Sequence, residues 1–358
     1  MNTHRIGRVL LAGTMLCLAA AAAPAQQYSM TTLAPYAGIP NTGMNNLGDV
    51  VGYSSAINNA FLYSGGTLTP LGLGYSTGTA TNNLKQIVLY STTAYHSYLL
   101  SPPNVYLVDL GTLGGGGGLL NRGITTGLSI NDSGTIVGYS NVNSTTYHAF
   151  QYARGRMTDL GTLGTTSAAT SINSYGQVVG YSLNSGGYQR AFQMVNGVMT
   201  DLDPANPTYD SGAMAINDLG QIVVQTNKAW CRLGPGPSRI SSRPSQVACR
   251  GSYYYTLLYS GSGATNIGNL GTTLGTYGNG VDKYGSVVGM TYPANSVQHA
   301  FLYRAGTMLD LNNHVSNLGT WSLWSADHIN DLGQIVCLAR APDGTYWSVL
   351  LSPTGPPA

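Results

Sequence analysis

One short pattern of apolar and polar positions recurs seven times along the chain. It consists of an apolar residue, Asn or Asp, two further residues, Gly, one residue and two β-branched residues, as in Ile130 to Val137. The seven Asn or Asp residues are Asn45, Asn82, Asn131, Asn173, Asn217, Asp282 and Asn330, which are 37, 49, 42, 44, 65 and 48 residues apart. Such intervals are typical of propeller blades and similar repeat arrays.

Each copy predicts a β-hairpin. A Gly such as Gly134 suits the left-handed position of a tight turn, and the flanking Ile and Val residues favour strands. The second copy has Lys85 in place of this Gly. A Cβ atom in the left-handed conformation costs about 1–2 kcal/mol. We therefore expect the turn at Lys85 to differ from the others.

Two further segments of each repeat predict strands. The sequence Tyr-His-Ala-Phe-Gln-Tyr begins at Tyr147, and all four Phe residues occupy the position of Phe150 in this segment. Alternation along a strand makes Phe150 a core residue. The sequence Met-Thr-Asp-Leu from Met157 follows, and the residues before each turn supply a fourth strand. Four strands in each of seven repeats predict an all-β protein, a single seven-bladed β-propeller over residues 26–353.

The two ends of the chain predict how the ring closes. The last repeat ends after Leu351 without its Met-Thr-Asp-Leu strand, whereas Tyr28 to Leu33 resembles such a strand. We expect this N-terminal strand to complete the last blade, which removes the exposed sheet edges that an open solenoid would have to cap. Residues 354–358 form a short tail.

The N-terminus predicts export. Arg5 and Arg8 precede an apolar run from Val9 to Ala23, and small residues follow up to Ala25. This is the pattern of a signal peptide over residues 1–25, with cleavage after Ala25. No later segment approaches eighteen consecutive apolar residues, so we expect no membrane insertion. The predicted location is secreted or extracellular, with the periplasm as the alternative.

The composition excludes several classes of function. Charged residues make up 8% of the chain, with 15 basic and 13 acidic residues, so removal of Arg5 and Arg8 leaves 13 of each. A neutral protein of this kind is not expected to bind nucleic acid. Every acidic residue is Asp, and no segment has the Glu, Lys and Ala content of long helices. We expect a monomer without a cofactor.

The motifs INDSGTIVGY, HAFQY and MTDLGTLG resemble those of the bacterial family of extracellular HAF-repeat proteins, named for their His-Ala-Phe run. The resemblance covers the chain after the signal peptide, and His148 and His299 begin complete His-Ala-Phe triplets. It implies export and a repeated β fold. It implies no catalytic residue.

The recurring polar residues favour a scaffold over a reaction centre. Asp109, Asp159, Asp201 and Asp310 share one repeat position, and Asp132, Asp218 and Asp331 share another. His96, His148 and His299 also share a position, and a ring of metal ligands around a channel is the alternative to a structural role. No zinc-type spacing supports a metal site. We therefore predict no metal and no catalytic residue.

Residues 227–252 form a basic insertion in the fifth repeat. It contains Lys228, Arg232, Arg239, Arg243 and Arg250, which are five of the thirteen basic residues that remain after export. Cys231 and Cys249 are expected to form a disulfide there, since the exported compartment is oxidising. Cys337 replaces a repeat Gly at a buried position and is expected to stay free.

The seven blades form a scaffold, so specificity is expected from the residues that differ among them. The candidate ligand-binding residues are Arg232, Arg239, Arg243, Arg250, His314, Trp321 and Trp324. Trp321 is also a candidate for simple packing. The predicted function is a non-enzymatic binding or structural module, with an acidic glycan or a cell-surface protein as ligand. The alternative is a secreted carbohydrate-active enzyme, a hydrolase or lyase, which usually needs two carboxylates.

Overall fold

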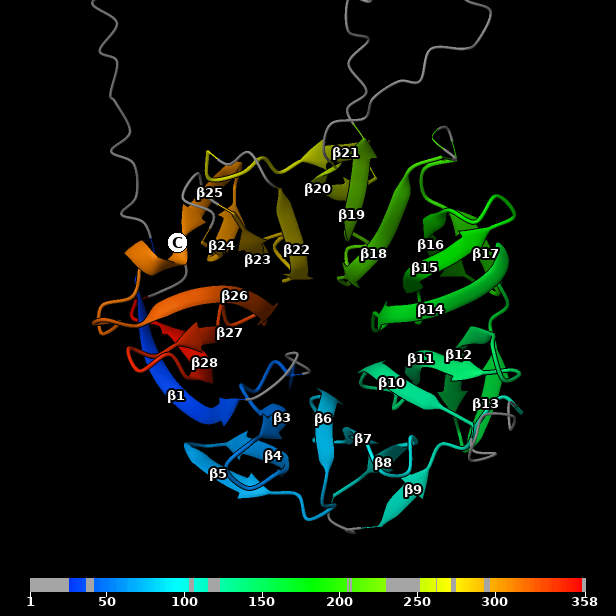
Figure 1. The fold of residues 1–358 in the computed structure, drawn as a ribbon, viewed down its shortest axis with the longest axis horizontal. Coiled ribbons are helices and arrows are strands. Elements are labelled where there is room, and N and C mark those ends of the chain that lie inside the picture. Colours follow the sequence, from blue (N-terminus) through cyan, green and yellow to red (C-terminus); the bar gives the residue numbers. More distant parts are fainter. Residues whose placement is uncertain are drawn as a thin grey trace, which may run out of the picture.

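The computed structural model describes residues 26–36, 42–102, 106–114, 123–204, 206, 208–229, 252–261, 263–271, 275–292 and 297–355. Within these residues, the strands form seven four-stranded sheets that are arranged as blades around a central axis (Figure 1). The predicted seven-bladed β-propeller is therefore confirmed. The predicted signal peptide, residues 1–25, lies outside the described residues.

We number the blades from the one that begins with β2. The innermost strands of blades 1 to 7 are β2 (Gly43–Met44), β6 (Ser76–Thr81), β10 (Thr125–Ile130), β14 (Gly164–Ile172), β18 (Asp210–Ile216), β22 (Thr276–Val281) and β26 (Ser322–Ile329). The second strands are β3 (Val50–Ser54), β7 (Ile87–Ser91), β11 (Ile136–Asn141), β15 (Val178–Asn184), β19 (Ile222–Ala229), β23 (Val287–Thr291) and β27 (Ile335–Arg340).

The third strands are β4 (Asn59–Ser64), β8 (Ser97–Leu100), β12 (Tyr147–Ala153), β16 (Gln189–Val195), β20 (Ser252–Ser260), β24 (His299–Arg304) and β28 (Tyr346–Pro353). The outermost strands are β5 (Thr67–Pro70), β9 (Leu107–Asp109), β13 (Arg156–Asp159), β17 (Val198–Asp201), β21 (Gly263–Asn266), β25 (Thr307–Asp310) and, for blade 7, β1 (Tyr28–Tyr36). A 3-10 helix, η1 (Leu311–Asn313), follows β25.

The antiparallel order of the strands gives the ring two different faces. The turns between the first and second strands, which contain the seven repeated Asn or Asp residues, lie at one end of the ring, which we call the turn face. The loops between the second and third strands, and the connections between blades, lie at the opposite end, the loop face.

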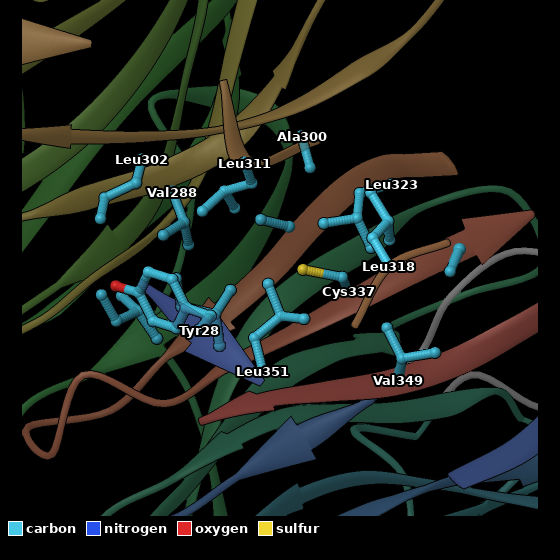
Figure 2. Packing of buried hydrophobic residues seen from close by; sticks show 14 residues of the cluster. Tyr28, Val288, Ala300, Leu302, Leu311, Leu318, Leu323, Cys337, Val349 and Leu351 are labelled. Carbon is cyan, nitrogen blue, oxygen red and sulfur yellow. The ribbon is translucent and has the colours of Figure 1, made fainter. Parts of the chain in front are cut away.

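The N-terminal strand completes blade 7, as predicted. β1 pairs with β28 from Tyr28 opposite Pro353 to Tyr36 opposite Tyr346. Tyr28 is fully buried and packs in the same hydrophobic cluster as Leu351 and Cys337 (Figure 2). Cys337 is a free, buried thiol, which confirms its expected state.

The core of the protein lies between the blades. Phe61, Phe150, Phe192 and Phe301 are fully buried, each directly opposite the Gly that follows the two β-branched residues of the same repeat on the neighbouring strand. Gly138, for example, pairs with Phe150. A Cβ at Gly138 would lie 1.9 Å from the carbonyl oxygen of Thr126 on β10, so only Gly permits this close approach.

The turn at Lys85 does not differ from the others, contrary to expectation. Lys85 adopts a left-handed φ of +58°, close to the +78° of Gly134. Its amide donates to the Asn82 carbonyl at 3.0 Å, as the amide of Gly134 donates to Asn131. The turn's hydrogen bonds hold Lys85 in this conformation despite its Cβ.

The repeated Asn side chains join the turns of neighbouring blades. The side-chain oxygen of Asn82 accepts from the amides of Leu84 and Gln86, and its Nδ2 donates to the carbonyl of Asn131 in the next blade at 2.9 Å. The donations to the next blade run Asn45 to Asn82, Asn82 to Asn131, Asn131 to Asn173, Asn173 to Asn217, Asn217 to Asp282 and Asn330 to Asn45. The last of these connects blade 7 to blade 1.

Asp282 interrupts this ring of hydrogen bonds between blades 6 and 7. Its Oδ1 accepts from the amides of Tyr284 and Ser286, like the Asn residues. Its buried Oδ2 has no hydrogen-bond partner, and the nearest cation is Arg304 Nη2 at 3.7 Å. Burial raises the pKa of Asp282. A carboxylate therefore stands where six other blades place a donor.

Asp282→Asn is expected to stabilise the fold by about 1 kcal/mol at pH 7. The new side-chain NH2 group would donate the missing hydrogen bond to the backbone carbonyl of Asn330. The folded-state pKa of Asp282 is raised, so ionisation of this group opposes folding at neutral pH. The advantage of the variant should therefore shrink as the pH falls through that pKa. Urea unfolding at pH 7 and pH 4.5 measures both effects.

The matched control for this experiment is Asp132→Asn. Asp132 lies next to the repeated Asn in its turn, and Asn46 and Asn83 occupy the same position in other blades. We expect little change in the free energy of unfolding from this control. A loss of stability in Asp282→Asn at pH 7 would show that the Arg304 ion pair outweighs the missing hydrogen bond.

Candidate functional site

Half-buried aromatic side chains gather at the loop face of several blades. Four of them follow the Val-Val-Gly or related segment of the second strand, at Tyr53, Tyr90, Tyr139 and Tyr181. The second strands run from the turn face to the loop face. Their Tyr residues therefore lie toward the loop-face end of each blade.

The tyrosines of blades 2, 3 and 4 contact one another across blade boundaries. The rings of Tyr139 and Tyr147 are 5.4 Å apart. Tyr90 lies beside Tyr139, and Tyr181 in blade 4 lies beside Tyr147 in blade 3. Burial raises the pKa of Tyr181 to about 12. Tyr181 therefore remains a neutral donor and acceptor near pH 7.

A second aromatic contact joins blades 5 and 6. The ring of Tyr277, near the start of β22, lies 4.8 Å from Tyr254 and 6.1 Å from Tyr292. Burial raises the pKa of Tyr277 to about 12. Tyr254 belongs to β20, so this cluster also crosses a blade boundary.

A third cluster lies in blades 7 and 1. The indole of Trp324 contacts Tyr346 edge to face at 5.1 Å, and the Arg340 guanidinium lies 5.8 Å from the Trp324 ring. Tyr36 at the end of β1 contacts Tyr53 of blade 1 at 6.5 Å. We call the whole set the aromatic rim: Tyr36, Tyr53, Tyr90, Tyr139, Tyr147, Tyr181, Tyr254, Tyr277, Tyr292, Trp324 and Tyr346.

Three of the candidate ligand-binding residues predicted from the sequence, His314, Trp321 and Trp324, lie within the described residues, and the structure places them apart from one another. Trp324 belongs to the aromatic rim. Trp321 contacts Trp347 at 6.0 Å and packs against the hydrophobic cluster of blades 6 and 7, in agreement with a packing role. His314 lies beside the start of β1, where its carbonyl accepts from the amide of Tyr28 at 2.8 Å. That is the opposite end of β1 from Tyr36.

Most of the basic insertion lies outside the described residues. Arg232, Arg239, Arg243, Arg250, Cys231 and Cys249 all fall within residues 230–251, so the predicted ligand contacts and the disulfide remain predictions. The paired strands extend into the insertion as far as Ala229, opposite Ser252. Because β19 and β20 are a second and a third strand, Ala229 and Ser252 lie at the loop face.

The recurring His and Asp side chains bond to each other within single blades. Nδ1 of His148 lies 2.8 Å from Asp159 Oδ2, and His96 with Asp109 and His299 with Asp310 repeat this pair. His148 and His299 are on third strands and His96 directly precedes one, so the three residues lie in separate blades away from the innermost strands, an arrangement that does not support a ring of metal ligands. Their carboxylate partners also accept backbone amides, as Asp159 does from Gly161 at 2.7 Å.

Blade 4 has an Arg variant of the same pair. Arg190 is fully buried and bonds Asp201 at 3.0 Å and the carbonyls of Asn206, Tyr209 and Asp203. The Asp of the third repeated segment therefore anchors the connection between blades. This geometry supports the scaffold role that the sequence indicated.

A small cavity lies on the axis, lined by residues from all seven innermost strands. Its volume of about 170 Å³ is below the roughly 300–1,000 Å³ of typical ligand pockets. His328 lines it, and burial lowers the pKa of this His. Burial raises the pKa of its neighbour Asp327 to about 6, but no carboxylate lines the cavity. The cavity therefore lacks the pair of carboxylates that most glycosidases need.

In the part of the chain that the structure describes, no helix is long and apolar enough to cross a bilayer. Over the same residues, His, Cys and Asp side chains do not form a group of three that could hold a metal ion.

The aromatic rim was missed by the sequence reasoning. Its only sequence signal is the Tyr that follows the second-strand residues Gly52, Gly138 and Gly180. The other members come from different strands and loops, and their approach depends on the order of the blades.

No protein-family model matches the chain, and no curated protein matches it in sequence. Solved structures resemble its fold. They include a puromycin-hydrolysing peptidase of Mycobacterium tuberculosis (TM-score 0.55, 10% identity, 91% of this chain and 51% of that one) and a puromycin hydrolase (TM-score 0.51, 13% identity, 89% and 55%). This chain thus spans about half the length of those enzymes. It also resembles YCF48 in a complex with a peptide (TM-score 0.50, 10% identity, 92% and 97%). At these identities the likeness concerns the propeller fold alone.

Proposed function

We propose that this protein is an exported, non-enzymatic binding module whose ligand lies across the loop face. The aromatic rim carries this proposal. Tyr and Trp side chains combine apolar contact area with a polar group and lose little conformational entropy on binding. Half-buried rings from neighbouring blades, with phenol hydroxyls between them, suit an uncharged or weakly acidic, hydroxyl-rich ligand such as a glycan.

Two observations favour binding over catalysis. The repeated Asp side chains are used in hydrogen bonds within the scaffold, as Asp159 and Asp201 show. The puromycin-hydrolysing relatives support an enzyme only weakly, because their similarity concerns a scaffold that hosts many functions. YCF48, of almost the same length, is a precedent for a propeller that holds a peptide.

The basic insertion belongs to the same proposal. Residues 230–251 hold Arg232, Arg239, Arg243 and Arg250, and the residues that flank them, Ala229 and Ser252, lie at the loop face. These residues would add positive charge beside the aromatic rim. A carboxylate-bearing glycan or protein partner would be attracted in a salt-dependent manner.

A glycan array beside a hydrolase substrate panel tests the proposal. We expect the wild-type protein to bind glycans on the array and to release no product from any substrate of the panel. Tyr139→Ser combined with Tyr181→Ser should weaken binding at least about tenfold, since buried aromatic contacts dominate binding energy. A measured melting temperature confirms that the variant is folded.

The matched controls are Tyr175→Ser and Tyr284→Ser. These tyrosines lie in the turns of the opposite face and are 76% and 65% exposed. We expect them to bind like wild type. Equal weakening by the control and rim variants, or turnover of any panel substrate, would contradict a non-enzymatic site at the loop face.

A further inference from the structure

The innermost strand of blade 7 contains an extra residue. Five other innermost strands and β26 share one register break three residues before the repeated Asn or Asp, as between Ala326 and His328. β26 has a second break between Leu323 and Ser325, and the inserted residue is Trp324. Such bulges re-aim a side chain and occur often beside binding sites.

The neighbours of Trp324 fix its ring. Its Nε1 donates to the Ser322 hydroxyl at 3.1 Å, and Tyr346 meets the indole edge to face with an interplanar angle of 85°. Both contacts come from the loop-face ends of β26 and β28. The indole is therefore held in place before any ligand arrives, which reduces the entropy lost on binding.

Arg340 supplies a positive charge beside this indole. It ends β27 directly opposite Tyr346, and its side chain is exposed. In the part of the chain that the structure describes, no carboxylate lies within 4.0 Å of its guanidinium. The equivalent second-strand positions in blades 3 and 4 are occupied by the uncharged residues Asn141 and Leu183. The charge is thus a feature of blade 7 and not of the repeat.

We propose that Trp324, Tyr346 and Arg340 form a subsite for a sugar that carries a carboxylate, that is, a uronic acid residue. The apolar C–H face of a pyranose ring packs on the indole. The guanidinium binds the carboxylate through two parallel hydrogen bonds, a geometry that Arg offers and Lys does not. This assignment rests on the proposed glycan-binding function. It adds the class of sugar that the blade 7 part of the aromatic rim would bind.

Titration calorimetry with trigalacturonic acid, its methyl ester and a neutral galactose trimer tests the subsite. We expect wild type to prefer the acid over the ester at least about tenfold, with the preference reduced at 0.5 M salt. Arg340→Gln should remove the preference for the acid over the ester. Arg340→Lys should retain only part of it. Trp324→Ala should weaken all three ligands.

Arg156→Gln is the matched control, since Arg156 is exposed at the start of β13 on the turn face. Melting temperatures confirm folding of each variant, and Arg340→Lys remains informative if Arg340→Gln is unstable. Retention of the acid preference by Arg340→Gln would overturn the subsite. Binding of the neutral trimer without any acid preference in wild type would also overturn it, yet leave the binding function standing. Failure of wild type to bind any probe or arrayed glycan would instead count against the proposed function.

Discussion

A chain that begins at Ala34 instead of Gln26 is expected to lose cooperative unfolding and to aggregate. The deletion removes most of β1, whose pairing with β28 completes blade 7. It exposes the edge of β28 and opens the cluster that Tyr28 fills (Figure 2). Exposed strand edges template association with other chains. Tyr28 also joins blade 7 to the connection from blade 6, because its amide donates to His314.

The measurement is thermal unfolding followed by circular dichroism, together with light scattering. A chain that begins at Gln26 is the matched control and should unfold cooperatively. Tyr28→Ala in that chain isolates the packing contribution and should cost about 3–5 kcal/mol, as for other large buried rings. A cooperative, monomeric chain from Ala34 would show that β28 does not need its partner.

Gly138→Ala is expected to destabilise the fold by about 3 kcal/mol, at the upper end of the usual cost of overpacking. The new Cβ would lie 1.9 Å from the Thr126 carbonyl oxygen, and neither backbone can yield without disturbing the ladder between β10 and β11. The carbonyl belongs to the rigid innermost strand. Gly180→Ala should behave alike, since its Cβ would lie 2.0 Å from the Ala168 carbonyl oxygen.

Urea unfolding of both variants measures the loss. Gly261→Ala is the control, because no atom lies within 4 Å of a Cβ at that position. We expect the control to change the free energy of unfolding by less than about 0.5 kcal/mol. A loss below 1 kcal/mol at both Gly138 and Gly180 would mean that the innermost strands shift easily.

The pairing of Gly with Phe shows which structural features can be predicted from a recurring sequence pattern. Each Phe, such as Phe150, lies opposite a second-strand Gly, such as Gly138, and blades that lack this Gly also lack the Phe. Leu89 faces Tyr98, Val224 faces Leu257 and Cys337 faces Val349. The recurrence of these residues at fixed spacing allowed the strands, their order and the buried state of Cys337 to be predicted from the sequence.

The turn at Lys85 shows that the conformational preference of a single residue does not determine the turn type. A Cβ in the left-handed region argued for a different turn, but the hydrogen bonds of Asn82 within its turn and to the next blade hold the usual one. A preference of about 1–2 kcal/mol is outweighed by the several contacts that fix this backbone.

The sequence by itself determined the strands, the seven repeats and the closing N-terminal strand, because hairpins and alternation depend on neighbouring residues. Only the tertiary structure decided which blades exchange hydrogen bonds, where Asp282 interrupts them, and which aromatic rings share the loop face. Asn330 donates to Asn45 across 285 residues, and Tyr181 reaches Tyr147 from another blade. No local pattern specifies such partners. They are selected when the ring closes and brings the corresponding ends of neighbouring blades together.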